Sequence, residues 1–131
     1  MKKVFISGKI TGLEERDWRK KFSEGAYKLM LQHGYKLADI IAPSRLKEVF
    51  PGLDYEQHMR VDLTLLDMCD AIYMLDNYKD SMGAQRELAY AIEQNKKIIW
   101  GSARKTPFND RTYAEQQIAE TLRMFEERQH D

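Results

Sequence analysis

Apolar residues follow two patterns along this chain. Short runs rich in apolar residues, at 3–6, 35–41, 71–75 and 98–100, are bounded by polar or glycine-containing turns and are too short for helices, so they predict strands. Over 14–33, 55–68, 81–95 and 112–128, apolar residues instead recur every three or four positions, which predicts amphipathic helices.

Strands that alternate with helices are expected to form right-handed βαβ crossovers. The pattern therefore predicts one α/β domain over residues 1–131, a Rossmann- or flavodoxin-like three-layer sandwich with a parallel sheet of four or five strands. Ligands of such sheets bind beyond the carboxyl ends of the strands, where the strand order reverses. The segments 7–12 and 76–81 each follow a strand and are expected to face one crevice, which the loop 44–52 is placed to cover.

Two acids lie on apolar stripes of the predicted helices. Asp62 comes three positions after Met59, on the face that also carries Leu63 and Leu66. Glu87 falls within a second stripe, formed by Ala84, Leu88, Ala91 and Ile92. A buried carboxylate needs a partner, a cavity or a chemical role. The alternative is that each acid lies at the polar border of its stripe, where Glu87, near a helix start, would interact favourably with the helix dipole.

Composition limits the classes of partner. The 131 residues suffice for one domain, and 21 Lys and Arg residues balance 21 Asp and Glu residues, so neither polymeric nucleic acid nor a membrane is expected as a partner. The single Cys69, and the lack of a hydrophobic signal segment after Met1, favour a cytoplasmic protein. His33, His58 and His130 have no metal-ligand spacing, so no metal site and no cofactor are expected.

The first predicted strand runs directly into a loop that contains two glycines, Gly8 and Gly12. A strand that ends in such a loop before a helix can present backbone N–H groups to an anion. The sequence is neither a P-loop nor a dinucleotide-binding GxGxxG motif. An ordinary βα turn, with glycines at positive φ, is an equal alternative.

Four segments together resemble the nucleoside 2-deoxyribosyltransferase superfamily. Residues 5–12 read FISGKITG, 58–62 read HMRVD, 69–72 read CDAI, and 81–88 read SMGAQREL. They are similar to that superfamily's motifs and follow its order, over residues 3–100 in total. The last block, with Ser, Gly and Glu-Leu at a strand-to-helix turn, is the most specific of the four. The chain looks most similar to the small nucleoside 5′-monophosphate N-glycosidase-like members and their phage and bacterial relatives.

The resemblance implies chemistry at an N-glycosidic bond. Glu87 matches the nucleophile, which forms a covalent glycosyl ester, and Asp62 matches the carboxyl group that protonates the departing base and activates the incoming water or base. Ser81 matches the serine with which the monophosphate enzymes bind phosphate, whereas the nucleoside transferases have Asp there. The substrate-binding residues expected on this basis are Ser7, Gly8, Lys9, Ile10, Gly12, Asp76, Ser81, Met82 and Gly83.

Cleavage of an N-glycosidic bond needs two carboxyl groups with different roles. An oxocarbenium-like transition state needs a carboxylate against the sugar and a proton donor on the leaving group. Two other functions stay open: a nucleotide-binding sensor or accessory module without chemistry, and cleavage of the glycosidic bond of NAD. Members of the superfamily are usually homo-oligomers, for which the stripe at 113–125 or the helix at 55–66 could supply the interface.

Overall fold

The computed structural model describes residues 2–43, 51–101 and 123. Most of the predicted loop at 44–52 and nearly all of the predicted helix at 112–128 lie outside these residues, as does the candidate interface at 113–125 apart from residue 123. In chain order the elements are β1 (Val4–Ser7), α1 (Glu15–His33), a 3-10 turn (Leu37–Asp39), β2 (Ile40–Ile41), α3 (Tyr55–Asp67), β3 (Ala71–Met74), a 3-10 turn (Tyr78–Asp80), α4 (Met82–Glu93) and β4 (Lys97–Trp100).

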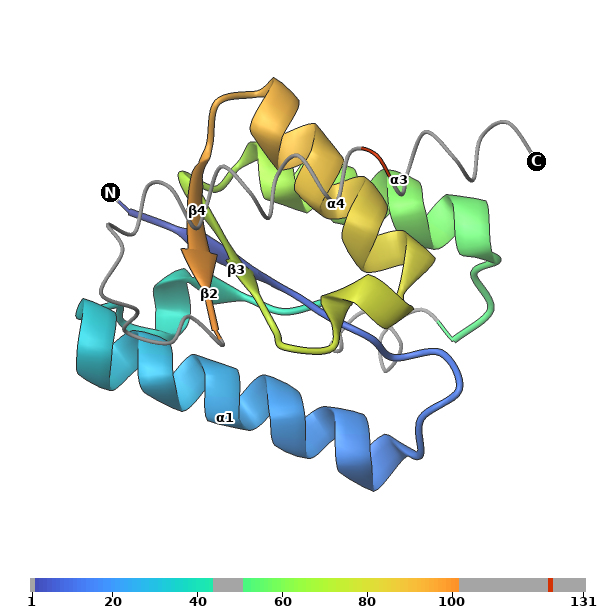
Figure 1. The fold of residues 1–131 in the computed structure, drawn as a ribbon, viewed down its shortest axis with the longest axis horizontal. Coiled ribbons are helices and arrows are strands. Elements are labelled where there is room, and N and C mark those ends of the chain that lie inside the picture. Colours follow the sequence, from blue (N-terminus) through green and yellow to red (C-terminus); the bar gives the residue numbers. More distant parts are fainter. Residues whose placement is uncertain (1, 44–50, 102–122, 124–131) are drawn as a thin grey trace.

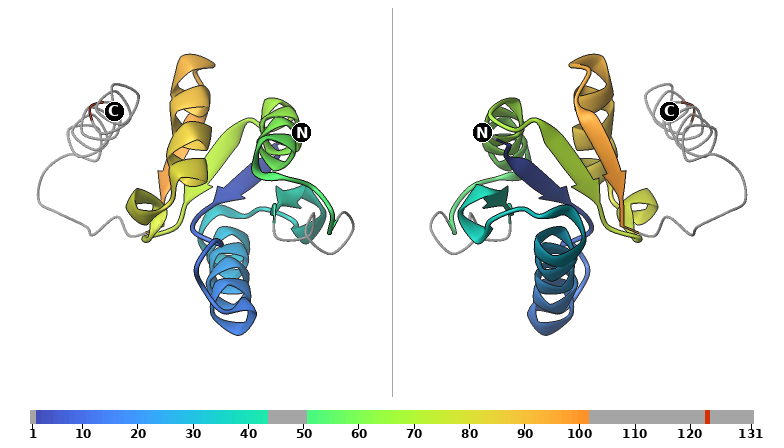
Figure 2. Two further views of the ribbon diagram at one scale, coloured as in Figure 1. Left: turned by 90° about the vertical axis from the view of Figure 1, so that its right-hand side faces the viewer. Right: turned by 90° about the vertical axis from the view of Figure 1, so that its left-hand side faces the viewer.

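The four strands form one parallel sheet in the order β2-β1-β3-β4 (Figure 1). From β1 the chain moves outward to β2, and it then returns to the other side of β1 to form β3. The strand order therefore reverses between β1 and β3, which is where such sheets bind ligands. In the two end views, α1 covers one face of the sheet while α3 and α4 cover the other, confirming the predicted three-layer α/β sandwich (Figure 2).

Side chains of each strand alternate between the two faces of the sheet. Val4 and Ile6 belong to the core that contains the buried residues of α1, whereas Phe5 packs with the core beneath α3 and α4. Ser7 comes two residues after Phe5 and ends β1, so its side chain points to the α3 and α4 face. The alternation thus brings a polar side chain to the carboxyl end of the central strand, under α4.

Capping residues fix the helix ends near the sheet. Asp54 caps α3 by accepting a hydrogen bond from the Gln57 backbone, and the Gln57 side chain bonds back to the Asp54 N–H. Ser81 caps α4, because its Oγ accepts from the Ala84 N–H at 3.1 Å. Gly34 ends α1 at φ 72°, in the left-handed region. These predicted helix boundaries are confirmed.

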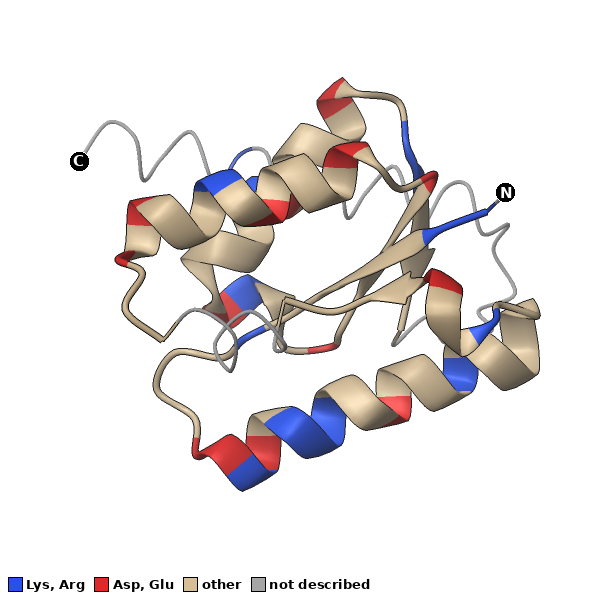
Figure 3. Ribbon diagram, turned by 180° about the vertical axis from the view of Figure 1, so that it is seen from behind, with Lys and Arg blue, Asp and Glu red and all other residues tan. Residues whose placement is uncertain are grey.

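Two details of the predicted fold are wrong. The strand expected over 35–41 is reduced to Ile40–Ile41, because Leu37–Asp39 form a 3-10 turn. The apolar residues of the helix predicted over 14–33 were expected on its buried face, but one of them, Met30, is 40% exposed, whereas Gly25 is buried. At 100° per residue, Gly25 lies about 20° from the direction of Trp18 and Met30 about 120°. Charges of both signs alternate along the outer face of α1, which is the solvated face that its sequence predicts (Figure 3).

Candidate active site

Packing of α3 against α4 brings the two predicted acids together on one side of the sheet. Asp62 lies on the inner face of α3 with Met59 and Leu66, and Glu87 lies on the inner face of α4 with Ala84 and Leu88. Asp62 is 8% exposed and Glu87 is 3% exposed. Both carboxyl groups are therefore buried within their stripes and do not lie at a solvated border.

The two carboxyl groups are hydrogen-bonded to each other, and Glu87 has a second partner in the Ser7 hydroxyl, which donates to Oε1 at 2.6 Å. Asp62 Oδ1 is buried and receives no hydrogen bond from an N–H or hydroxyl group in the part of the chain that the structure describes. A carboxyl group can donate to another carboxyl group only when it carries a proton. The geometry therefore fits a pair that holds one shared proton.

Burial raises the pKa of both acids. For Glu87 the rise is large, because burial acts together with repulsion from Asp62, while the Ser7 hydrogen bond and the charge of Arg86 lower its pKa. For Asp62 burial again raises the pKa, opposed by the hydrogen bond to Glu87 and by the charge of His58. Because Glu87 is the more deeply buried acid, we assign the shared proton to Glu87.

A cavity of about 740 Å³ opens beside the carboxyl pair, within the usual size range of small-molecule sites. Its described walls come from the loop after β1, from the first turns of α3, and from the start of α4. Two backbone contacts hold the loops after β1 and β3 together: the Lys9 N–H donates to Asn77 Oδ1 at 3.1 Å, and the Leu75 N–H donates to the Ser7 carbonyl at 2.9 Å. The cavity therefore lies at the point where the strand order reverses.

The start of α4 forms one wall of the cavity and can receive an anion. Ser81, Met82 and Gly83 all line the cavity. N–H groups in the first turn of a helix have no acceptor within the helix and point outward with the positive end of the helix dipole. The Ser81 Oγ accepts from Ala84, so its own proton remains available for a ligand.

Most of the predicted binding residues meet at this cavity. Besides both acids and the three residues that open α4, Gly8, Lys9 and Ile10 line it. A Cβ on Gly8 would come within 2.5 Å of the Leu75 side chain, so this position needs glycine for close approach of two loops. Gly12 has φ 84° and is exposed, and it is not among the lining residues.

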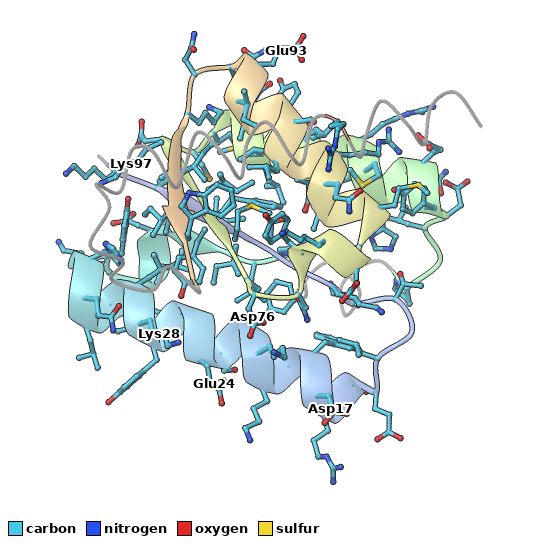
Figure 4. All side chains as sticks on the ribbon, viewed as in Figure 1. Asp17, Glu24, Lys28, Asp76, Glu93 and Lys97 are labelled. Atoms are coloured by element: carbon cyan, nitrogen blue, oxygen red, sulfur yellow. The ribbon has the colours of Figure 1, made fainter. Side chains whose placement is uncertain are left out.

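Ser7 and Asp76 lie away from the cavity surface. Ser7 is fully buried behind Glu87 and contacts its carboxyl group, so it has no surface to offer to a substrate in this structure. Asp76 lies on the α1 side of the sheet, where it forms an ion pair with Lys21 at 2.9 Å (Figure 4). Tyr78, which also follows β3, is buried and packs against the Trp100 ring.

Several lining residues were not among the predicted substrate-binding residues. The aromatic ring of Tyr55, the first residue of α3, lies beneath the Arg86 guanidinium, 5.6 Å from it. Arg86 in turn pairs with Glu56 at 3.0 Å, which ties α3 to α4. The remaining lining residues outside the prediction are Thr11, Pro43, Pro51, Leu53, His58, Met59, Asp80 and Ala84. Of these eight residues, Thr11, His58, Met59 and Ala84 lie within the motifs at 5–12, 58–62 and 81–88, whereas Pro43, Pro51, Leu53 and Asp80 lie outside every motif.

Other reactive groups in the described part of the chain are not arranged as sites. Cys69 is buried, and burial raises the pKa of its thiol to about 11, which makes it an unreactive core residue. Among residues 2–43 and 51–101, no cluster of three His, Cys, Asp or Glu side chains could hold a metal ion. No helix in this same part of the chain is long and apolar enough to cross a membrane.

Comparison with known proteins identifies one family. A family described as "Domain of unknown function (DUF4406)" matches residues 2–100, which is more than half of the chain and includes the whole described site. No curated protein and no solved structure matches the chain.

Proposed function

The chain belongs to the DUF4406 family of domains of unknown function, and from its site we propose that it cleaves or transfers the N-glycosidic bond of a (deoxy)nucleoside 5′-monophosphate through a covalent ester on Glu87. The observation that carries the proposal is the hydrogen-bonded pair of buried carboxyl groups beside a cavity that also contains the start of α4. The resemblance of four motifs to the nucleoside 2-deoxyribosyltransferase superfamily supports the same assignment.

In the first step, Glu87 acts as a carboxylate and Asp62 as an acid. A Glu87 oxygen forms a bond to the anomeric carbon while the bond from that carbon to the base nitrogen breaks. The electron pair of the broken bond stays on the base, and the base takes the proton from Asp62. Glycosidases that form such an ester hold their two carboxyl groups about 5–5.5 Å apart. In this structure Asp62 and Glu87 bond to each other, so we expect a bound sugar to break that bond and separate the two groups.

In the second step, Asp62 acts as a base. It removes a proton from water, or from the nitrogen of an incoming base, while the attacking atom bonds to the anomeric carbon. The ester bond then breaks and returns Glu87 as a carboxylate. The pair therefore carries one proton at the start of the cycle and one at the end. The hydrogen bond between the two acids requires this same protonation state.

A phosphate group fits the start of α4. The backbone N–H groups of Met82 and Gly83 and the Ser81 hydroxyl offer donors there, and Lys9 on the facing loop adds a positive charge within the same cavity. Tyr55 and Met82 are 45% and 53% exposed at the cavity wall and offer apolar surface to a flat base. The proposed ligand is thus bound by its phosphate at α4 and its sugar at the acids.

The test is release of free base from a panel of ribo- and deoxyribonucleoside 5′-monophosphates, with nucleosides and NAD alongside, followed by chromatography. We expect base from at least one monophosphate with the native protein and none with Glu87→Gln. Glu24→Gln, the same chemical change at an exposed position of α1, is the matched control and should retain full activity.

Two results would contradict the proposal. Release of nicotinamide from NAD, without reaction of any monophosphate, would indicate an NAD glycohydrolase. No release from any compound, also with a second base added as acceptor, while a monophosphate still raises the melting temperature, would indicate a nucleotide-binding module without chemistry.

The same resemblance suggests a homo-oligomer. On α3, one of the two candidate interface segments, Tyr55 is 45% exposed, and Met68, directly after the helix, is 57% exposed. We propose that these ends of α3 lie near a contact with a second copy. Light scattering coupled to size exclusion should give a mass above that of one 15.5 kDa chain, and a monomeric mass at assay concentration would refute this part of the proposal.

A further inference from the structure

We propose that Ser7 is a positioning residue of this site: its hydroxyl holds the Glu87 carboxyl group in one orientation and favours Glu87 over Asp62 as the ionised member of the pair. The inference rests on the proposed function for its role in catalysis. The hydrogen bond on which it is based is formed by the protein's own side chains and can be tested without any substrate.

The fold places Ser7 where it can act only on Glu87. It is the last residue of β1, pairs with Met74 of β3, and is 0% exposed. Its Oγ lies 2.6 Å from Glu87 Oε1, although 80 positions separate the two residues in the sequence. A serine at this point of the core costs burial of a hydroxyl group, which the bond to Glu87 offsets.

The direction of this hydrogen bond determines its effect. The Ser7 hydroxyl donates and Glu87 Oε1 accepts, because the proton shared by the two acids lies between Glu87 and Asp62. A hydroxyl group bonds more strongly to a carboxylate than to a neutral carboxylic acid. Ser7 therefore stabilises ionised Glu87, the form that attacks the sugar, and shifts the shared proton from Glu87 toward Asp62, the group that protonates the base.

Other groups that face Glu87 oppose or assist this effect. Asp62 from α3 repels the ionised form, and burial disfavours it, whereas Arg86, the preceding residue of α4, favours it. His58 on α3 acts on Asp62, whose pKa it lowers. Lys9 lines the same cavity from the loop after β1. Among these groups Ser7 is the one that hydrogen-bonds Glu87 without carrying a charge, so its removal changes the balance without altering the net charge of the site.

Loss of the hydroxyl should move the proton toward Glu87. The hydrogen bond from Ser7 stabilises the form of the pair with ionised Glu87 and protonated Asp62. Its removal should therefore reduce the fraction of molecules in that form about 10- to 100-fold. The rate at pH 7 should fall by the same factor, and the acidic limb of the pH–rate profile should move to higher pH, because more of the Glu87 must be deprotonated before it can attack.

The experiment is a titration of the Glu87 side-chain carboxyl carbon by ¹³C NMR in the full chain without ligand, with the signal assigned by its loss in Glu87→Gln. We compare the native protein with Ser7→Ala and with Ser7→Cys, which keeps a weak donor of similar shape. Thr64→Val is the matched control, because it also removes a hydroxyl group, but from an exposed position of α3. The Thr64 hydroxyl donates to the Arg60 carbonyl of the same helix.

We expect the Glu87 titration midpoint to rise in Ser7→Ala, to rise less in Ser7→Cys, and to stay unchanged in Thr64→Val. An unchanged or lower midpoint in Ser7→Ala would overturn the inference, even if the variant melts at a lower temperature, because a purely structural serine would affect stability alone. If Ser7→Ala does not fold, the Ser7→Cys midpoint decides in the same way. A raised midpoint in a protein that releases no base would retain this inference and reject the proposed function.

Discussion

Replacing Glu87 by Gln should make the fold more stable at alkaline pH. Gln has the shape of the protonated acid, so it keeps the hydrogen bond from Ser7 and can donate to Asp62. In the native chain, burial and Asp62 raise the pKa of Glu87 well above its ordinary value of 4.5. As the pH rises above that ordinary value, the unfolded chain releases the proton while the folded chain retains it, so the native chain loses stability that the variant keeps.

The magnitude follows from the contact between the two acids. Two ionised carboxylates 4 Å apart repel each other by about 4 kcal/mol at an effective dielectric constant of 20. Relaxation of the pair and entry of water reduce this figure, so we expect Glu87→Gln to raise the free energy of unfolding by about 2 kcal/mol at pH 9. At roughly 4 °C per kcal/mol for a domain of this size, the melting temperature should rise by about 8 °C. At pH 4, where Glu87 is protonated in both states, the gain should vanish.

Thermal unfolding followed by circular dichroism between pH 4 and 9 measures this difference directly. Glu24→Gln is the control for loss of one negative charge, and its exposed position should keep the change within about 0.5 kcal/mol at every pH. A Glu87→Gln variant that is no more stable than the native chain at pH 9, or that is equally stabilised at pH 4 and pH 9, would refute a buried, proton-sharing pair.

Three further predictions concern the same site. Activity should follow a bell-shaped pH profile, since the pair needs one proton, and a profile that stays flat above the ordinary carboxyl range would contradict this. Ser81→Asp should preserve the α4 cap and the melting temperature, because Asp also caps helices. It adds a negative charge at the phosphate position, so kcat/KM should fall much more for monophosphates than for nucleosides. Gly83→Ala should leave the fold unchanged or stabilise it by up to about 1 kcal/mol, since its Cβ would meet nothing closer than Met59 Sδ at 3.5 Å. The same variant should bind a monophosphate more weakly, as measured by calorimetry. Unchanged affinity would show that the ligand does not bind against the start of α4.

The periodicity of apolar residues was sufficient to predict the layers and the two acids. Positions three and four apart on a helix share a face, so the apolar neighbours of Asp62 and Glu87 determine that both carboxyl groups are buried. Alternation of strands with helices also predicted that the loops after β1 and β3 meet at one crevice, as the contact of Lys9 with Asn77 confirms.

Contacts that depend on strand register and on loop direction could not be predicted in this way. Ser7 meets Glu87 because β1 lies beneath α4, and no local pattern specifies that pairing across the sheet. Asp76 lies beyond the end of β3 at Met74, so the alternation of the strand does not determine the direction of its side chain. The Asp76 side chain points toward Lys21 on α1. Tyr55 lines the cavity through the packing of α3 on α4, which involves Arg86 from a distant part of the sequence.

Detection of the covalent intermediate would identify the nucleophile directly. The protein is mixed with the panel of nucleoside 5′-monophosphates, quenched in acid within the first turnover, and measured by mass spectrometry, both intact and after digestion. We expect a (deoxy)ribosyl 5′-phosphate adduct on the peptide that contains Glu87, absent from Glu87→Gln and still present in Glu24→Gln. Release of base with no adduct at any time, or an adduct on a different residue, would contradict the assignment of Glu87 as the nucleophile.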